Sequence, residues 1–192
     1  EKLEYLENKK TGRFKIVKDI GNKDIVNSLK FNNTPVNVTF NNQERVEDLA
    51  GRVSKQIYED STSLLSAFID KEFLQNNGLD EKNILSIFIP NSYNIYWNTS
   101  SEDFRDRMLA EYNKFWNKDR SKKAQKLGLT KLEVISLASI VQIESKRNDE
   151  RPRVAGLYIN RLKKNMRLQA DPTVIYTIKE YYKNFDTIIR RV

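Results

Sequence analysis

Hydrophobic side chains occupy almost every face of residues 130–146, and this pattern predicts the most deeply buried helix of the chain. Thr130 and Glu133 have the spacing of a capping box, in which each residue satisfies a backbone N–H group at the start of a helix. A helix that is apolar nearly all round is typical of the centre of a domain. Its apolar positions are Leu132, Val134, Ile135, Leu137, Ala138, Ile140, Val141 and Ile143.

Glu144, at the far end of this helix, is in phase with the apolar stripe that Leu137 and Val141 define. A carboxylate in this position is costly to bury unless it is paired, hydrated or protonated. One interpretation is that the helix frays there, so that Glu144 is solvated or pairs with Arg147. The other is a general acid that apolar surroundings keep protonated near neutral pH.

The rest of the chain combines short alternating segments with amphipathic ones, and it therefore predicts an α+β fold. Residues 84–97 are dense in apolar and aromatic side chains, and Pro90 indicates a strand that passes into a loop. Residues 118–128 are expected to be a basic linker. The other expected strands are 12–17 and 36–40, and the expected helices are 24–29, 41–57 with an Asn41–Glu44 cap, 63–73 and 99–118 with a Thr99–Glu102 cap.

A second helix is predicted to begin near Pro152, a residue suited to the first turn. Gly156 lies inside this helix at a cost of about 1 kcal/mol relative to alanine, which close approach of the Glu144 helix would justify. Residues 166–170 are expected to be a short strand. Asp171 precedes Pro172, and by itself it is best interpreted as the N-cap of a further apolar helix.

The composition of the 192-residue chain removes several classes of enzyme. It contains no cysteine and no histidine, which excludes Ser-His-Asp and Cys-His catalysis and the common zinc enzymes. An enzyme built from this inventory must rely on carboxylates, lysine, tyrosine or backbone donors. The net charge of +8 favours polyanionic partners, but the basic residues are scattered and form no tract typical of nucleic-acid binding.

No apolar run approaches the roughly 20 residues that a membrane-spanning helix needs. The chain begins with Glu1 rather than methionine, and it ends at Val192 without a turn or cap signal. These two features lead us to expect a fragment trimmed at both ends, with any membrane anchor outside it.

Residues 137–176 read LASIVQIESKRNDERPRVAGLYINRLKKNMRLQADPTVIY, and they resemble the YceG-like family of endolytic murein transglycosylases. The similarity covers the family's ASIVxxE(T/S), ERPxVAGVFxNRL and MRLQ(T/A)DPTVIY blocks almost without gaps. A weaker match is FIPNSYNIYWNTS at 88–100, and residues 12–57 resemble a LysM-like amino-terminal part. The resemblance implies a LysM-like subdomain with connecting helices over residues 1–82, and a helix-rich catalytic domain, truncated at its C-terminus, over residues 83–192.

The resemblance also implies an activity and a site. Members of the family are lyases that cut β-1,4 MurNAc–GlcNAc bonds of new glycan strands and leave 1,6-anhydro-MurNAc ends. Their essential glutamate falls on Glu144, which would act as acid and then base without a metal or cofactor. Many members have another glutamate where this chain has Gln142, which supports Glu144 as the acid. The matching blocks place Asn160, Arg161, Gln169, Asp171, Thr173 and Tyr176 at the substrate.

Family members are bacterial proteins anchored in the inner (plasma) membrane by one N-terminal helix, with the catalytic domain on the periplasmic or extracytoplasmic side. The resemblance therefore implies peptidoglycan glycan strands as the main partner, with peptidoglycan synthases or division proteins as further ones and no nucleic acid. It also implies a role in the biogenesis and organisation of the cell wall.

Two alternatives stay open at this point. The first is a muramidase that uses Glu144 as acid and Asp171 as the second carboxylate, because hydrolytic glycosidases need such a pair. The second is a non-catalytic protein that binds cell-wall glycan. Tyr93, Tyr96 and Trp97 fit either a hydrophobic core or a platform for sugar rings.

Overall fold

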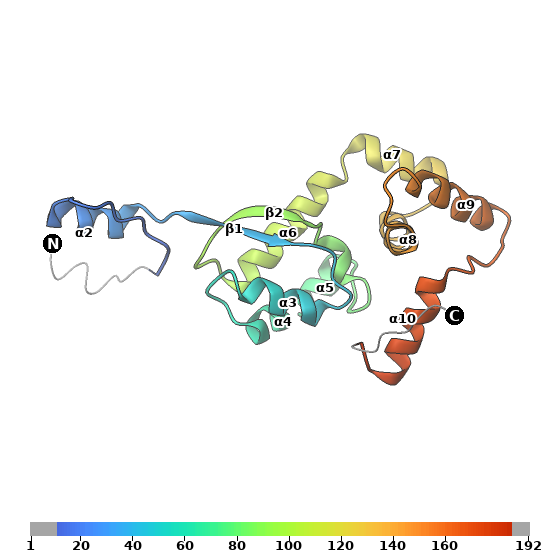
Figure 1. The fold of residues 1–192 in the computed structure, drawn as a ribbon, viewed down its shortest axis with the longest axis horizontal. Coiled ribbons are helices and arrows are strands. Elements are labelled where there is room, and N and C mark those ends of the chain that lie inside the picture. Colours follow the sequence, from blue (N-terminus) through green and yellow to red (C-terminus); the bar gives the residue numbers. More distant parts are fainter. Residues whose placement is uncertain (1–10, 186–192) are drawn as a thin grey trace. The chain divides into compact units, whose positions relative to one another are not determined.

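The computed structural model describes residues 11–185, and it divides the chain into two compact units whose boundary in the sequence lies between Phe115 and Trp116 (Figure 1). The two chain ends, on which the expectation of a trimmed fragment rests, lie outside the described residues. The boundary expected after residue 82 falls inside the first unit, and it stays a prediction about family modules. Helices dominate the described residues and accompany a small sheet, so the α+β class is confirmed.

Unit 1, which ends at Phe115, contains a two-stranded antiparallel sheet of β1 (Pro35–Phe40) and β2 (Asn91–Tyr96). Alternate residues of both strands face the core, as the period of two requires. The strand expected at 12–17 is wrong, because Phe14 forms only an isolated bridge with Asn33.

The order expected around Pro90 is also wrong. The structure has a 3₁₀ turn, η1 (Ile84–Ile87), before the proline and strand β2 after it. The proline therefore precedes the ladder and removes none of its hydrogen bonds.

Helix α3 (Val46–Ser54) packs against β1, and α3 lies beside α4 (Ser61–Phe68) (Figure 1). Asp60 and Asp70 start α4 and α5 by accepting hydrogen bonds from backbone N–H groups. The expected Asn41–Glu44 cap is wrong, because the Asn41 side chain accepts a hydrogen bond from Gln43 and α3 begins only at Val46. The helices of unit 1 are α2 (Asn22–Phe31), α3 (Val46–Ser54), α4 (Ser61–Phe68), α5 (Lys71–Asn76) and α6 (Ser101–Phe115).

The cap of α6 is one residue later than expected. Ser100, not Thr99, accepts a hydrogen bond from the backbone N–H of Asp103. The core of unit 1 centres on aromatic contacts of Phe68, whose ring centroid lies 4.6 Å from that of Phe88 and 6.0 Å from that of Phe104. Its fully buried large side chains are Val38, Leu49, Val53, Leu64, Phe68, Ile84, Ile87, Phe104 and Met108.

Unit 2, which starts at Trp116, is formed by helices in its described part. The basic linker expected at 118–128 is wrong, because Asn117 caps a helix there and Gly128 ends it with a positive φ of 71°. The strand expected at 166–170 is also wrong, since this segment is a loop between two helices. The helices are α7 (Lys118–Leu127), α8 (Lys131–Glu144), α9 (Arg151–Lys163) and α10 (Asp171–Tyr182).

Helix α8 starts with the predicted capping box, in which Thr130 and Glu133 bond to each other's backbone N–H groups. It packs against α9 and α10, but the expected burial on nearly all sides is wrong: Leu137 and Val141 are buried, whereas Ile143 is 60% exposed. The buried cluster of this unit adds Tyr158 of α9 and Ala170 from the loop before α10.

No helix between residues 11 and 185 has the length and apolarity that a membrane crossing requires.

Candidate active site

Glu144 is the last residue of α8, one turn after the buried Val141, so the carboxylate does end the buried stripe. Its side chain is half-buried, and the Oε2 atom is removed from solvent. Arg147, a partner considered for Glu144, pairs instead with Asp149 at 2.8 Å and with Glu150 at 3.4 Å. The fold therefore places the Glu144 carboxylate where the buried side chains of α8 end and the protein surface begins.

Ser145, the residue after Glu144, is a buried polar side chain with only 6% exposure. Its hydroxyl donates a hydrogen bond of 2.8 Å to Glu150 and accepts one of 3.2 Å from the backbone N–H of Arg147. The Arg151 Nε donates to the Ser145 carbonyl oxygen at 3.2 Å.

These bonds hold the backbone that follows Glu144 and thereby restrict where its side chain can point. Glu150 and Arg151 look like an ordinary first-turn pair in the sequence. Their role depends on the turn that folds them back onto Ser145.

The Arg161 side chain is held by hydrogen bonds to the loop before α10. Its Nη1 donates to the Leu168 carbonyl oxygen at 2.6 Å and to the Gln169 side-chain oxygen at 3.0 Å. Gln169 has a φ of 52°, a conformation that is unfavourable for residues other than glycine and that this contact stabilises. The structure thus brings Arg161 and Gln169 together and shows that Arg161 positions the loop before α10.

Asp171 is not the N-cap of α10, which corrects the interpretation drawn from the Asp-Pro pair. Ala170 is the N-cap residue, and Asp171 is the first residue of the helix and is exposed. Among the described residues, its carboxylate has no hydrogen-bond or ion-pair partner. Thr173 donates its hydroxyl to the Ala170 carbonyl oxygen at 2.7 Å, so Thr173 stabilises the start of this helix.

The buried cluster connects the two halves of the candidate site. Ala170 is 1% exposed and belongs to the same cluster as Val141, so the loop that carries Gln169 and the start of α10 at Asp171 are tied to α8. Asn160 and Tyr176 are exposed, and the Tyr176 ring lies edge-on to Phe185 at 5.9 Å. All of these candidates belong to unit 2.

Gly156 contradicts one expectation about α9. A Cβ atom built on it would have no neighbour within 4 Å, so no helix backbone approaches it closely. The glycine faces open space on a helix that contributes to the candidate site.

A cavity of about 590 Å³ lies in unit 1, remote in sequence from Glu144. It is bordered by α4, α5 and α6, and carboxylates of Asp70, Glu72 and Glu102 line it. Arg105 also lines it, stacked 3.9 Å above the Phe73 ring. Among the described residues, no group of three or more acidic side chains has an arrangement that could hold a metal ion.

Residues 2–191 match the model of the YceG-like family, and the chain belongs to this family. It is similar to the endolytic murein transglycosylase of Bacillus subtilis strain 168, with 37% identity over 79 residues, which are 41% of this chain and 21% of that protein. It is also similar to the endolytic murein transglycosylase of Streptococcus pneumoniae serotype 2 strain D39, with 32% identity over 91 residues, 45% of this chain and 16% of that protein. The matched regions thus span about a fifth or less of these relatives.

Proposed function

We propose that the chain acts on peptidoglycan as a lytic transglycosylase and that Glu144 is its general acid and base. The observation that carries this proposal is the half-buried Glu144 carboxylate at the end of the α8 stripe, inside the segment that matches the family blocks. The names of the two relatives support the reaction class.

The proposed reaction needs one carboxyl group. Protonated Glu144 donates its proton to the glycosidic oxygen while the bond between that oxygen and C1 of MurNAc breaks. The resulting carboxylate then accepts the proton of the MurNAc C6 hydroxyl, whose oxygen bonds to C1 and closes a 1,6-anhydro ring. Glu144 regains its proton and no water is consumed.

The remaining candidate residues have three different roles in this proposal. Arg161 and Thr173 make hydrogen bonds within the chain, so they act by positioning the loop and the start of α10. Gln169 lies on that loop, where the Arg161 contact sets its orientation toward the glycan. The exposed Asn160, Asp171 and Tyr176 are the ones that we assign to direct contact with the glycan.

A muramidase remains the alternative with a specific observation in its favour, namely the exposed Asp171 carboxylate at the start of α10. A hydrolase would use it to activate water or to attack C1. A non-catalytic glycan-binding role is the alternative of another class.

The test is to incubate the full-length protein with purified glycan strands and to identify the products by mass spectrometry. Transglycosylation predicts anhydro ends and no added water, whereas reducing ends alone would establish the muramidase. Glu144→Gln should abolish cleavage, and Glu133→Gln on the same helix should leave it intact. Equal cleavage by Glu144→Gln would remove Glu144 as the acid, and binding without cleavage by the wild type would favour the non-catalytic role.

Two further parts of the proposal concern the location and partners of the protein and its N-terminal module. We place the protein at the extracytoplasmic face of the plasma membrane, where its substrate is, with peptidoglycan synthases or division proteins as candidate partners. We also keep a LysM-like module in the N-terminal part. This part of the proposal rests on the sequence resemblance of residues 12–57.

A further inference from the structure

Helix α7 concentrates positive charge on a short segment of unit 2. Five of its ten residues are basic and one is acidic, so this helix has a net charge of +4, half of the net charge of +8 of the whole chain. In an irregular linker these charges would point in many directions. Because the segment is a helix, its geometry fixes which of the charges share a face.

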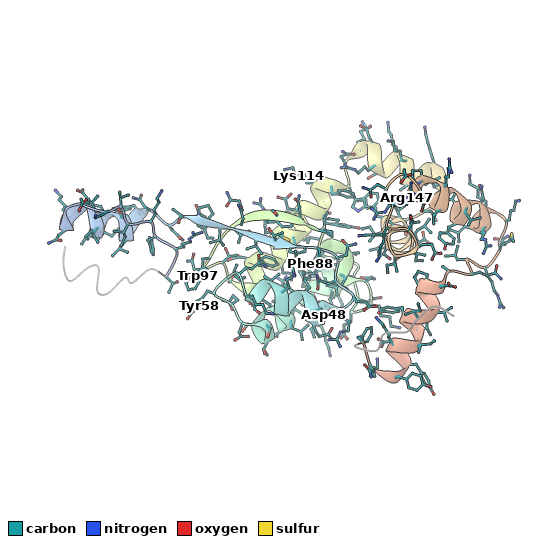
Figure 2. The ribbon with its side chains drawn as sticks, viewed as in Figure 1. Asp48, Tyr58, Phe88, Trp97, Lys114 and Arg147 are labelled. Atoms are coloured by element: carbon teal, nitrogen blue, oxygen red, sulfur yellow. The ribbon has the colours of Figure 1, made fainter. Side chains whose placement is uncertain are left out.

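The buried side of α7 is marked by Ala124, which is 5% exposed. At 3.6 residues per turn, Lys122 and Lys126 lie on the opposite side of the helix. Lys118 and Lys123 flank them, and all four lysines are exposed. In Figure 2, many of the side chains along α7 project away from α8, the helix against which α7 packs. We call the surface formed by Lys118, Lys122, Lys123 and Lys126 the lysine face.

The lysine face is not neutralised by carboxylates of the described chain. Within residues 11–185, no ion pair involves any of its four lysines, and Asp119, the one acidic residue of α7, pairs with none of them. Three of the lysines are spaced four residues apart, an arrangement in which like charges repel each other and destabilise a helix. Helix α6 uses the same spacing for an attraction, since Arg107 there pairs with Glu111 at 2.8 Å. The repulsion in α7 is one that a covering layer of anions would relieve.

We propose that the lysine face binds the headgroups of an anionic phospholipid bilayer. A lysine ammonium group is a compact charge on a flexible stem, so it pairs with phosphate groups without requiring a fixed geometry. The four lysines spread over a broad side of the helix rather than along one line. A plane of phosphate groups can therefore meet all of them, whereas a single linear polymer meets fewer.

The composition of α7 indicates how the bilayer is contacted. The helix contains no aromatic residue, and its single large apolar side chain is Leu127 at its end. Helices that insert into the interface carry such side chains along one face, so α7 binds by charge at the level of the headgroups. This inference goes beyond the proposed function, because the lysine face takes no part in the cleavage step. The contact would hold unit 2, which contains Glu144, beside the membrane.

The test is to sediment the 192-residue chain with vesicles of phosphatidylcholine alone, or of equal parts of phosphatidylglycerol and phosphatidylcholine. Binding to the mixed vesicles only is expected, and it should weaken as salt is added, because physiological salt screens charges beyond about 8–10 Å. The α7 variant combines Lys118→Gln, Lys122→Gln, Lys123→Gln and Lys126→Gln. Each lysine at an anionic surface strengthens binding about fivefold, so this variant should bind roughly two to three orders of magnitude more weakly.

The matched control removes four exposed lysines of unit 1, in the combination Lys15→Gln, Lys18→Gln, Lys55→Gln and Lys82→Gln. It has the same net charge as the α7 variant, and it should bind the mixed vesicles nearly as tightly as the wild type does. Glutamine and lysine have similar helix propensities, so circular dichroism should show that both variants are folded. The α7 variant should unfold at no lower temperature than the wild type, because the repulsion along the helix is removed.

The outcomes separate the lysine face from its alternatives. Equal losses in the two variants would assign binding to net charge alone and overturn the proposal, as would equal binding to both kinds of vesicle or no binding to the mixed ones. Binding of soluble inorganic polyphosphate that requires the four lysines, without binding to vesicles, would identify a linear polyanion instead and also overturn it. Glu144→Gln should bind vesicles as the wild type does. Lysine-dependent vesicle binding by a protein that does not cleave glycan would support the lysine face and reject only the catalytic proposal.

Discussion

The two units of the chain differ in how completely they bury their apolar side chains. Unit 1 has fully buried leucine, phenylalanine and methionine side chains from several helices, together with Val38 of β1. In the described part of unit 2, the buried cluster around α8 comprises Leu137, Val141, Tyr158 and Ala170. On the same helices, Ile143, Leu157 and Val174 are each more than half exposed. Among the described residues, the candidate acid therefore belongs to the unit with fewer fully buried side chains.

This difference shows where stability and chemistry are located in the chain. Local opening is easiest where few apolar contacts must be broken, and such regions often carry binding and catalytic groups. In unit 2, hydrogen bonds of polar side chains also hold the structure in place, because Ser145 and Arg161 fix the segments on either side of α9. The predictions below test the comparison, beginning with the largest expected effect.

A pair of leucine truncations addresses the comparison directly. Leu64→Ala in unit 1, where Leu64 is fully buried, should cost near the upper end of the roughly 2–5 kcal/mol expected for such changes. Leu137→Ala in unit 2, at 9% exposure, should cost near the lower end, because solvent already reaches its neighbours. Hydrogen exchange of backbone amides, measured residue by residue, gives both values, and equal losses would contradict the difference in packing.

Arg161→Ala should loosen the loop before α10. The substitution removes charge-assisted hydrogen bonds to Leu168 and Gln169 and should lower the stability of unit 2 by about 1.5–3 kcal/mol. Amide exchange should rise first at residues 167–171, and Arg161→Lys should restore little because one ammonium group lacks the guanidinium fork. If only the affinity for glycan changed and the exchange rates did not, Arg161 would contact substrate rather than position the loop.

Gly156→Ala should stabilise unit 2. The added Cβ atom meets open space, so the helix gains roughly 1 kcal/mol from the propensity of alanine. Thermal unfolding and glycan cleavage, measured on the same sample, separate two cases. Higher stability with unchanged cleavage is the expected outcome, whereas higher stability with reduced cleavage would place substrate against this part of α9. A loss of stability would show that α9 is packed more tightly than the structure has it.

The smallest effect concerns the capping box of α8. Hydrogen bonds from the Thr130 backbone N–H, and then from its hydroxyl, hold the pKa of Glu133 below its ordinary value. Because the folded-state pKa is depressed, this contribution to stability is present above about pH 4.3, the ordinary range of glutamate, and is lost as the pH falls through the folded pKa. Thermal unfolding of wild type and Glu133→Gln should show a smaller acid-induced decrease for the variant, and parallel pH profiles would argue against the prediction.

Much of the candidate site followed from local pattern and from the matching blocks. The period of α8 identified Glu144 as the end of a buried stripe, and the Thr130–Glu133 spacing located the start of the helix correctly. Both depend on residues within a few positions of each other, which is why the sequence sufficed. The assignment of α7 to a linker failed, although Asn117 and Gly128 were visible cap signals, because its polar composition outweighed them.

Tertiary structure alone decided the features that join distant residues. The Asp-Pro pair indicated a cap at Asp171, but Ala170 is the N-cap residue and Asp171 is the exposed first residue of α10. The period of α8 could not tell which of its apolar faces would be covered, because coverage depends on where α9 and α10 pack. Tyr93 and Tyr96 have similar neighbours along the chain, and only the pairing of β1 with β2 buries one and leaves the other to solvent.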